Sequence, residues 1–314
     1  MLIPINKPSI TVIGSYAVGM TIGTPHFPTA GETVMGYRFH MLHGGKGSNQ
    51  AVVCSRMGAK VLFGACVGDD KFGEMCMSLH AQENVDTRYI KKSDRGTATG
   101  TGIVLVNDQG ENEIVIDFGA NLEFSPADVD AMLPDIKKTK LVMMQLEMNI
   151  DTVLYVAWRC REMSLPFILN PAPYQPLPQE LLPLCTYLTP NQTEARQILG
   201  LSSTDTTPED VLATRLLDHG AQNVAMTLGK RGALLANDGG IRHFASIPVE
   251  AVDTTGAGDT FNGMLGTALA EGKTCETAIQ YAVIAAGLAV TKFGVIESIA
   301  YRDEVERLYQ EIYG

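Results

Sequence analysis

Strand-like and helix-like segments alternate along most of this chain. Residues 9–14 are apolar and extended in character, residues 50–58 repeat apolar side chains at helical spacing, and residues 60–64 return to a strand pattern. Helical stretches such as 152–163 and 208–219 separate later segments that we expect to be strands, namely 141–146, 166–169, 187–189, 224–228 and 233–236. This alternation predicts an α/β fold with a mostly parallel central sheet and helices on both faces.

Two regions interrupt the alternation. Residues 21–42 contain two prolines and alternate in polarity from Thr33 onward. Residues 97–117 hold two alternating runs on either side of a polar turn at 107–110, which is the pattern of a β-hairpin. Such inserts predict a small β-sheet that acts as a lid. We expect an α/β core made of residues 1–16, 43–96 and 118–314 and a lid made of residues 17–42 and 97–117.

Size and charge narrow the possible partners. The 314 residues include 24 Lys and Arg against 35 Asp and Glu, a net charge of -11, which argues against nucleic acid or an anionic membrane as a partner. The longest apolar run, 282–290, is shorter than the ~20 residues that a bilayer needs.

Six cysteines without metal-binding spacing are expected to be free thiols. Residues 1–9 lack a secretory signal, so we expect a cytoplasmic protein.

A glycine-rich turn at residues 253–259 joins an extended run, 244–252, to a helix that carries apolar residues from Phe261 onward. Gly256 and Gly258 let the backbone approach a ligand, and the N–H groups of a first helical turn attract an anion. Asp259 is a poor partner for phosphate unless it takes a proton from the hydroxyl that attacks the phosphate. The turn indicates phosphoryl transfer to an alcohol, although a helix-capping aspartate would also explain it.

A second glycine-rich turn, residues 43–50, also precedes a helix and carries Lys46 and Asn49. It is not a P-loop, because glycine follows the lysine. The turn after the first strand, residues 14–19, lacks the glycine spacing of dinucleotide-binding folds. Two large nucleotide-binding classes are therefore disfavoured.

Together, the two turns and five further segments resemble the ribokinase family of carbohydrate kinases. The further segments, in chain order, are residues 67–70, 145–147, 170–173, 191–194 and 227–229. The resemblance implies a ribokinase-like α/β fold with a β-sheet lid. It also implies an ATP-dependent kinase that transfers the γ-phosphate to a primary hydroxyl of a small sugar.

The resemblance further implies a role for individual positions. Asp259 would be the catalytic base, beside an anion hole formed by the amides of Gly256, Ala257 and Gly258. The residues that face the sugar would be Gly44, Gly45, Lys46, Asn49 and Glu147. The residues near the nucleotide would be Asn191, Thr227 and Gly229, with Glu194 holding Mg²⁺ through water. A K⁺ site would be formed by Asp253, Thr255, Ala289, Lys292, Gly294 and Ser298. Family members also suggest a homodimer formed through the lid.

Asn191 and Glu194 have a second interpretation that needs no metal. Asn at a helix start and Glu three positions later form the pattern of a capping box. The sequence leaves both interpretations open.

The turn at residues 14–19 departs from the family pattern. Family members that act on ribose usually carry Asn and Asp where this chain has Ala17 and Gly19. Each buried hydroxyl left unpaired costs about 1 to 3 kcal/mol, so the two changes together cost about 10-fold to 10⁴-fold in discrimination. The departure argues against D-ribose and favours a bulkier sugar, or one with a non-polar or charged substituent. Tyr16, Met20 and His43 would either shape that pocket or pack under the lid.

Two other functions remain open at this point. One is a nucleoside or sugar-derivative kinase of the same fold. The other is a non-catalytic sensor of sugar or nucleotide, although both glycine turns and Asp259 are intact.

Overall fold

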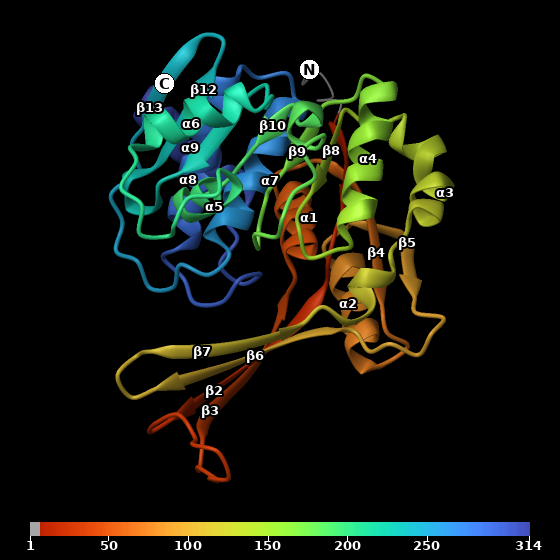
Figure 1. Cartoon of the computed structure of the whole chain (residues 1–314), viewed down its shortest axis with the longest axis vertical. Coiled ribbons are helices and arrows are strands. Elements are labelled where there is room, and N and C mark those ends of the chain that lie inside the picture. Colours follow the sequence, from red (N-terminus) through yellow and green to blue (C-terminus); the bar gives the residue numbers. More distant parts are fainter. Residues whose placement is uncertain (1–6) are drawn as a thin grey trace.

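A nine-stranded sheet forms the core of the protein in the computed structural model, which describes residues 7–314 (Figure 1). From one edge to the other its strands are β13 (Gly240–Phe244), β12 (Ala233–Asn237), β11 (Val224–Thr227), β10 (Tyr187–Leu188), β9 (Phe167–Leu169), β8 (Leu141–Met144), β1 (Ser9–Ile13), β4 (Lys60–Val67) and β5 (Asp86–Lys92). The pairs from β11 to β5 are parallel, and β12 and β13 add an antiparallel edge. The predicted mostly parallel sheet is confirmed.

Helices cover both faces of this sheet (Figure 1). They are α1 (Lys46–Arg56), α2 (Lys71–Gln82), α3 (Pro126–Ile136), α4 (Ile150–Glu162), α5 (Gln192–Ile198), α6 (Glu209–Asp218), α7 (Ala257–Ala270), α8 (Cys275–Ala289) and α9 (Arg302–Tyr313). Along β8, Val142 and Met144 join the core that contains α3, α4 and α6, whereas Met143 joins the core on the α1 side. Central strands are buried on both faces, which explains their continuous apolar character.

Two edge strands were missed by the sequence pattern, and one expected extended segment is a loop. β5 and β13 are rich in charged or polar residues, so neither shows the apolar signal of a central strand. The run predicted to be extended over 244–252 has only its first residue in a strand, because β13 ends at Phe244. Pro248 lies within the loop that follows and has no N–H to donate to a sheet.

A separate four-stranded sheet projects from the core (Figure 1). Its strands, in order, are β3 (Tyr37–Gly44), β2 (Ala17–Thr24), β6 (Gly100–Asn107) and β7 (Asn112–Asp117). β6 and β7 form the predicted antiparallel hairpin. β2 pairs in parallel with β6, so the two ribbons join into one mixed sheet, which the local patterns did not indicate. We refer to this sheet as the lid sheet.

The cysteines and the apolar helices agree with their sequence interpretation. All six cysteines are free thiols, and five of them are buried. Burial raises the pKa of the Cys54 thiol to about 12. Among the helices of residues 7–314, none combines the length and the apolar character that a membrane crossing requires.

Helices α1 and α7 approach each other closely. A Cβ atom at Gly263 would lie 2.5 Å from the Cβ of Val53 and 3.0 Å from the carbonyl oxygen of Gln50. The missing side chain therefore permits the approach, and any larger residue would push the helices apart. This contact sets the distance between the start of α1 and the start of α7, where both glycine-rich turns lie.

Candidate active site

The two glycine-rich turns meet at the carboxyl edge of the parallel strands. A cavity of about 230 Å³ lies there, and its lining residues come from both turns and from the strand ends. They are Lys46, Asn170, Ala172, Thr189, Asn191, Glu194, Thr227, Thr254, Gly256, Gly258, Asp259 and Asn262. Open α/β sheets bind ligands at this edge, where the loops that follow the strands converge.

Asp259 is a buried carboxylate in the first turn of α7, with 6% of its surface exposed. Its Oδ2 accepts a hydrogen bond from Asn49 Nδ2 at 2.8 Å, and its Oδ1 accepts one from Gln50 Nε2 at 3.1 Å. Both donors are consecutive residues of α1. A buried charge requires such partners, and the helix N-terminus adds positive partial charge. The carboxylate is thus held in place beside the cavity.

The turn before α7 has a conformation that requires glycine. Gly256 adopts a left-handed backbone with φ of 76°, and a Cβ there would lie 2.5 Å from Val295 Cγ1. Gly256 and Gly258 line the cavity. The Ala257 amide donates to the Thr254 carbonyl at 3.3 Å, a long hydrogen bond that an anion would have to replace. The three predicted amides therefore lie together at the start of α7.

Lys46 lines the cavity together with the predicted nucleotide-side residues Asn191 and Thr227, and Glu147 is hydrogen-bonded to the Lys46 backbone. Glu147 Oε2 accepts a hydrogen bond from the Lys46 backbone amide at 2.8 Å and another from the Ser15 hydroxyl. The charge of Asp259 raises the pKa of the Lys46 ammonium above its ordinary value, although burial acts in the other direction. Lys46 therefore stays positively charged beside the carboxylate.

Gly45 also has to be glycine, whereas Gly19 does not. Gly45 has φ of 87°, and a Cβ there would lie 2.6 Å from Tyr16 Cα. Gly44 pairs with Ala17 across β2 and β3. A Cβ at Gly19 would meet only the Leu42 carbonyl oxygen, at 3.8 Å. The short side chain at position 19 is therefore not forced by packing.

The residues considered for shaping the sugar pocket divide into two groups. Tyr16 is fully buried, and its hydroxyl forms a hydrogen bond of 2.8 Å with His43 Nδ1. Met20 packs against the core cluster that contains Tyr16 and Val18. Tyr16 therefore lies in the core, Met20 packs against that core from strand β2 of the lid sheet, and His43 on β3 is half-buried beside Tyr16.

Asn191 and Glu194 form the capping box that the sequence left open. The Asn191 side chain accepts from the Glu194 amide, and Glu194 Oε2 accepts from the Asn191 amide, both at 2.8 Å. Burial raises the pKa of the Glu194 carboxyl above its ordinary value, opposed by the Asn191 amide and the charge of Lys46. Both residues also line the cavity, and Asn191 bridges to Thr227 in extension of the β10–β11 pairing. Gly229 follows with φ of 58°.

The residues proposed from the family for K⁺ lie on two connected loops. Asp253 Oδ1 accepts from the Thr255 amide at 2.9 Å, and its Oδ2 accepts from the Gly294 amide at 3.2 Å. Burial acts to raise the pKa of the Asp253 carboxyl, but these hydrogen bonds hold it below its ordinary value. The Ala289 carbonyl accepts from the Lys292 amide at 3.3 Å.

In the loop that follows α8, the side chains of Lys292 and Ser298 interact with groups other than Asp253. The Ser298 hydroxyl donates to the Val295 carbonyl at 2.8 Å, and the Lys292 ammonium lies 3.8 Å from Glu304. Over residues 7–314 no group of three or more His, Cys, Asp or Glu side chains is arranged to hold a metal ion. Backbone carbonyls and the Asp253 carboxylate are among the oxygen donors that the two loops offer.

Several buried amide side chains near Asp259 were not assigned a role from the sequence. Gln50 Nε2 donates to Asn170 Oδ1 at 3.1 Å as well as to Asp259, and Gln145 Nε2 donates to Gln50 Oε1 at 2.6 Å. Gln145 and Asn170 each follow the last residue of a central strand. A polar residue directly after a buried strand was the available signal, because such residues meet at one edge of a parallel sheet.

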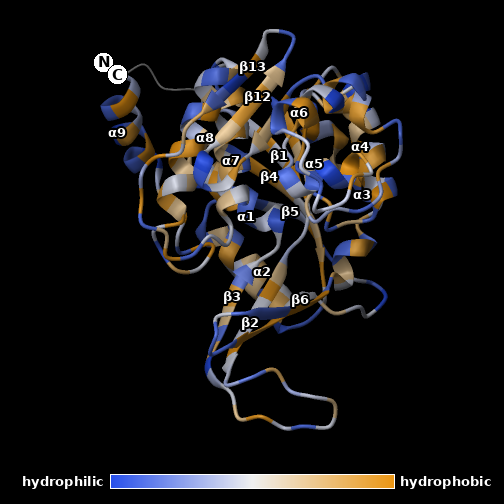
Figure 2. Ribbon diagram, turned by 60° about the vertical axis from the view of Figure 1, so that its left-hand side comes forward, coloured by the Kyte–Doolittle hydropathy of each residue, from blue (hydrophilic) through white to orange (hydrophobic). Residues whose placement is uncertain are grey.

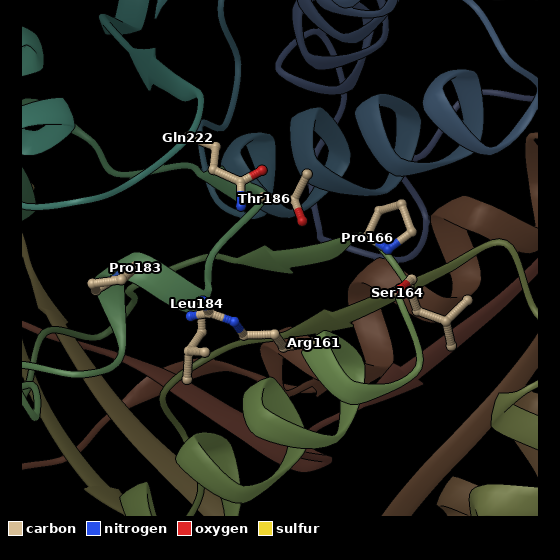
Figure 3. A pocket seen from close by; sticks show the side chains of 8 residues that line it. Arg161, Ser164, Pro166, Pro183, Leu184, Thr186 and Gln222 are labelled. Atoms are coloured by element: carbon tan, nitrogen blue, oxygen red, sulfur yellow. The ribbon is translucent and has the colours of Figure 1, made fainter.

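Other cavities lie at the opposite edge of the sheet. Figure 3 shows one of about 360 Å³, whose lining includes Pro166, Thr186 and Gln222, just before β9, β10 and β11. Another, of about 630 Å³, includes Ser9, Lys60 and Lys140 at the amino ends of β1, β4 and β8. Neither cavity contains a residue of the two glycine-rich turns.

Comparison with known proteins identifies the family of this chain. The family model of the pfkB family carbohydrate kinases matches residues 7–301. A ribokinase from Haemophilus influenzae is 38% identical over 298 residues, which cover 95% of this chain and 97% of that protein. A deoxyribokinase from Salmonella typhi is 33% identical over 290 residues, which cover 92% of this chain and 94% of that protein.

A solved structure has the same fold over nearly the whole chain. Arabidopsis thaliana ribokinase, complexed with ribose and ATP, superposes with a TM-score of 0.88 at 28% identity and covers 96% of this chain and 98% of that one. The predicted ribokinase-like fold and the resemblance to the ribokinase family are confirmed. This chain therefore belongs to the pfkB family of carbohydrate kinases.

Proposed function

We propose that this protein is an ATP-dependent sugar kinase in which Asp259 activates a primary hydroxyl of a small sugar. The observation that carries the proposal is the buried Asp259 carboxylate, hydrogen-bonded by two amide side chains at the edge of a cavity that also contains Gly256, Gly258 and Lys46. A base beside a positively polarised helix N-terminus suits transfer of a phosphoryl group to an alcohol. The ATP-bound relative supports ATP as the donor.

The proposed reaction is a displacement at the γ-phosphorus, for which this chain supplies a base and groups that stabilise charge. Asp259 accepts the proton of the sugar hydroxyl as its oxygen attacks the γ-phosphorus. The bond from the γ-phosphorus to the β–γ bridging oxygen breaks, and ADP leaves. The amides of Gly256, Ala257 and Gly258, together with the Lys46 ammonium, stabilise the charge on the transferred group.

Further residues would bind the substrates and the ions. Glu147, Asn49, Gly44 and Gly45 would hold the sugar, and Asn191, Thr227 and Gly229 would hold the nucleotide. Glu194 uses Oε2 in its capping box, and carboxylate oxygens suit Mg²⁺ bound through water. Mg²⁺ bound there would neutralise phosphate charge. The lid, residues 17–42 and 97–117, would close over the core of residues 1–16, 43–96 and 118–314 and exclude water; residues 1–6 lie outside the described range.

A substitution can test whether Asp259 acts as a base or only stabilises the N-terminus of α7 by its charge. We expect Asp259→Asn to lower kcat by about 10²-fold to 10⁴-fold for any accepted sugar, because the amide cannot accept the proton. KM for ATP should change little. Asp303→Asn is the matched control, because Asp303 lies exposed in the first turn of α9. Near-normal turnover of Asp259→Asn in a coupled ADP-release assay would refute the assignment.

The sugar is proposed from the turn at residues 14–19. The two relatives above are named for ribose and for deoxyribose, so relatives alone do not fix the substrate. Ala17 and Gly19 offer no side-chain hydrogen-bond partner to sugar hydroxyls, and a Cβ at Gly19 would make only an ordinary contact with the Leu42 carbonyl oxygen. We infer a bulkier sugar, or one with a non-polar or charged substituent, as the preferred substrate.

This inference predicts a measurable change of specificity. Turnover should be compared over pentoses, hexoses, deoxysugars, sugar acids and nucleosides, where D-ribose should not give the highest kcat/KM. The double variant Ala17→Asn, Gly19→Asp should raise kcat/KM for D-ribose by about 10-fold or more, since it restores two partners for buried hydroxyls. D-ribose as the best substrate of the unmodified enzyme would overturn the inference. A nucleoside as the best substrate would favour the alternative kinase, and no turnover of any compound would favour a sensor.

A K⁺ ion would bind between the loops of Asp253 and Gly294 and hold the anion-hole turn in shape. The proposal is supported by the hydrogen bonds from Thr255 and Gly294 to Asp253, which already connect these loops, and by the carbonyl groups around Ala289 and Lys292. Activity should therefore be severalfold higher in KCl than in NaCl of equal ionic strength. Asp253→Asn should remove most of this difference. Equal activity in both salts would count against the site.

A homodimer formed through the lid sheet would cover an apolar row. Met41, Ile103 and Val115 are aligned with Met20 across all four strands and are 43%, 48% and 70% exposed, whereas Met20 itself packs against the core. In Figure 2 the lid sheet shows hydrophobic stretches, such as that along β6, next to hydrophilic ones. Exposed sheet edges and apolar faces favour such pairing.

The dimer can be tested at Val115. Val115→Lys should convert a dimer to a monomer in light scattering after gel filtration, because it places a charge in the apolar row. Glu113→Lys, two residues earlier on the same exposed strand, changes charge without removing apolar surface and should leave the dimer intact. A monomeric unmodified protein would refute this proposal.

A further inference from the structure

Asn49 and Gln50 both donate to Asp259, but their surroundings differ. Asn49 is 5% exposed, and its Oδ1 is buried without a hydrogen-bond partner among the described residues. Gln50 is fully buried and has a partner for each of its polar groups: Nε2 donates to Asp259 and Asn170, and Oε1 accepts from Gln145. A buried amide oxygen without a partner is costly, so Asn49 is suited to exchange its partner for a ligand. Gln50 has no polar atom left for a ligand.

Gln50 belongs to a chain of polar side chains that follows the carboxyl edge of the sheet. The chain begins at Gln145 after β8, passes through Gln50 to Asn170 after β9, and continues as Asn170 Nδ2 donates to the Thr189 carbonyl at 3.0 Å after β10. The Thr189 hydroxyl then donates to Asn262 Oδ1 on α7 at 2.5 Å. The chain therefore joins three neighbouring strands to the two helices that carry the turns.

The negative charge of Asp259 sets the direction of this chain. If the Gln50 side-chain amide were flipped, its Oε1 would face Asp259 Oδ1. Two buried acceptor oxygens would then lie side by side without a hydrogen bond, which is unfavourable. With the present orientation, Gln50 Oε1 faces the Gln145 Nε2 donor at 2.6 Å. Gln145 thus supports the one orientation of Gln50 in which both N–H groups are used.

We propose, building on the assignment of Asp259 as base, that Gln50 is a positioning residue that fixes Asp259 Oδ1 and leaves Oδ2 as the oxygen that takes the sugar proton. Oδ1 is held by a side chain that the sheet edge locks in place. Oδ2 is held by Asn49, which has a free acceptor and is predicted to face the sugar. Misplacement of a reacting group by about 1 Å costs on the order of 10²-fold in rate, so such locking matters for turnover.

The test replaces Gln50 with methionine, which has nearly the same length and no donor. We expect Gln50→Met to lower kcat by about 10-fold to 10²-fold while KM for ATP changes less than about threefold, because the nucleotide-side residues are untouched. Gln145→Met, which removes only the support of Gln50, should show the same pattern with a smaller loss.

A matched control separates positioning from packing. Cys54 lies one helical turn after Gln50 on α1, is fully buried, and its Sγ contacts the Gly263 carbonyl on α7 at 3.4 Å. Cys54→Ala loosens the same helix contact without touching Asp259, so it should lower the thermal midpoint but leave kcat within about twofold. Thermal midpoints of all variants show whether each one is folded.

The outcomes distinguish this inference from the proposed base. If Asp259→Asn lacks activity but folded Gln50→Met keeps kcat within about twofold, the positioning role is wrong and the base stands. If Cys54→Ala loses as much kcat as Gln50→Met, packing explains the loss and the inference is overturned. If Asp259→Asn is itself active, the base assignment fails first.

Discussion

The candidate active site is organised around one buried carboxylate, that of Asp259. Removing a charge from water is unfavourable unless hydrogen bonds and nearby dipoles replace the lost solvation. Here two amide donors from α1 and the N-terminus of α7 supply that replacement. The glycine at position 263 permits the helix approach that brings these donors within reach. The close contact between α1 and α7 therefore serves the geometry of this charge.

The core of the fold could be predicted from the sequence, because central strands are apolar on both faces. The edge strands β5 and β13 could not, since their residues are charged or exposed and their pairing is decided by neighbouring strands. The lid hairpin β6–β7 was visible locally. Its parallel pairing with β2 was not, because the paired residues, such as Ala17 and Gly100, are far apart in the chain.

In the candidate site, too, residues with a local sequence pattern could be predicted, whereas contacts between residues far apart in the chain could not. Asp259, Lys46 and the required glycines have local signatures, namely a turn followed by a helical pattern. The partners of Gln50 are 95, 120 and 209 residues away, so no local pattern names them. At Asn191 and Glu194 the local pattern fitted both a capping box and a metal site, and the structure contains the capping box. The proposed role of Glu194 toward Mg²⁺ would use its other carboxylate oxygen, Oε1, because Oε2 accepts the hydrogen bond of the capping box.

The residues proposed for the chemistry and those proposed for the choice of sugar lie in physically different surroundings. Asp259 and Gln50 lie in a buried network, where loss of either side chain removes a hydrogen-bond partner from the other. Gly19 lies at the base of the lid sheet, where a Cβ has ordinary room, and the same holds for its neighbour Gly102 on β6. Side chains there can be added without disturbing the core, whereas the carboxylate and its donors cannot be changed separately. Under the proposed function, the fold keeps one phosphoryl-transfer reaction, while the lid-sheet surface that we propose meets the sugar is free to differ.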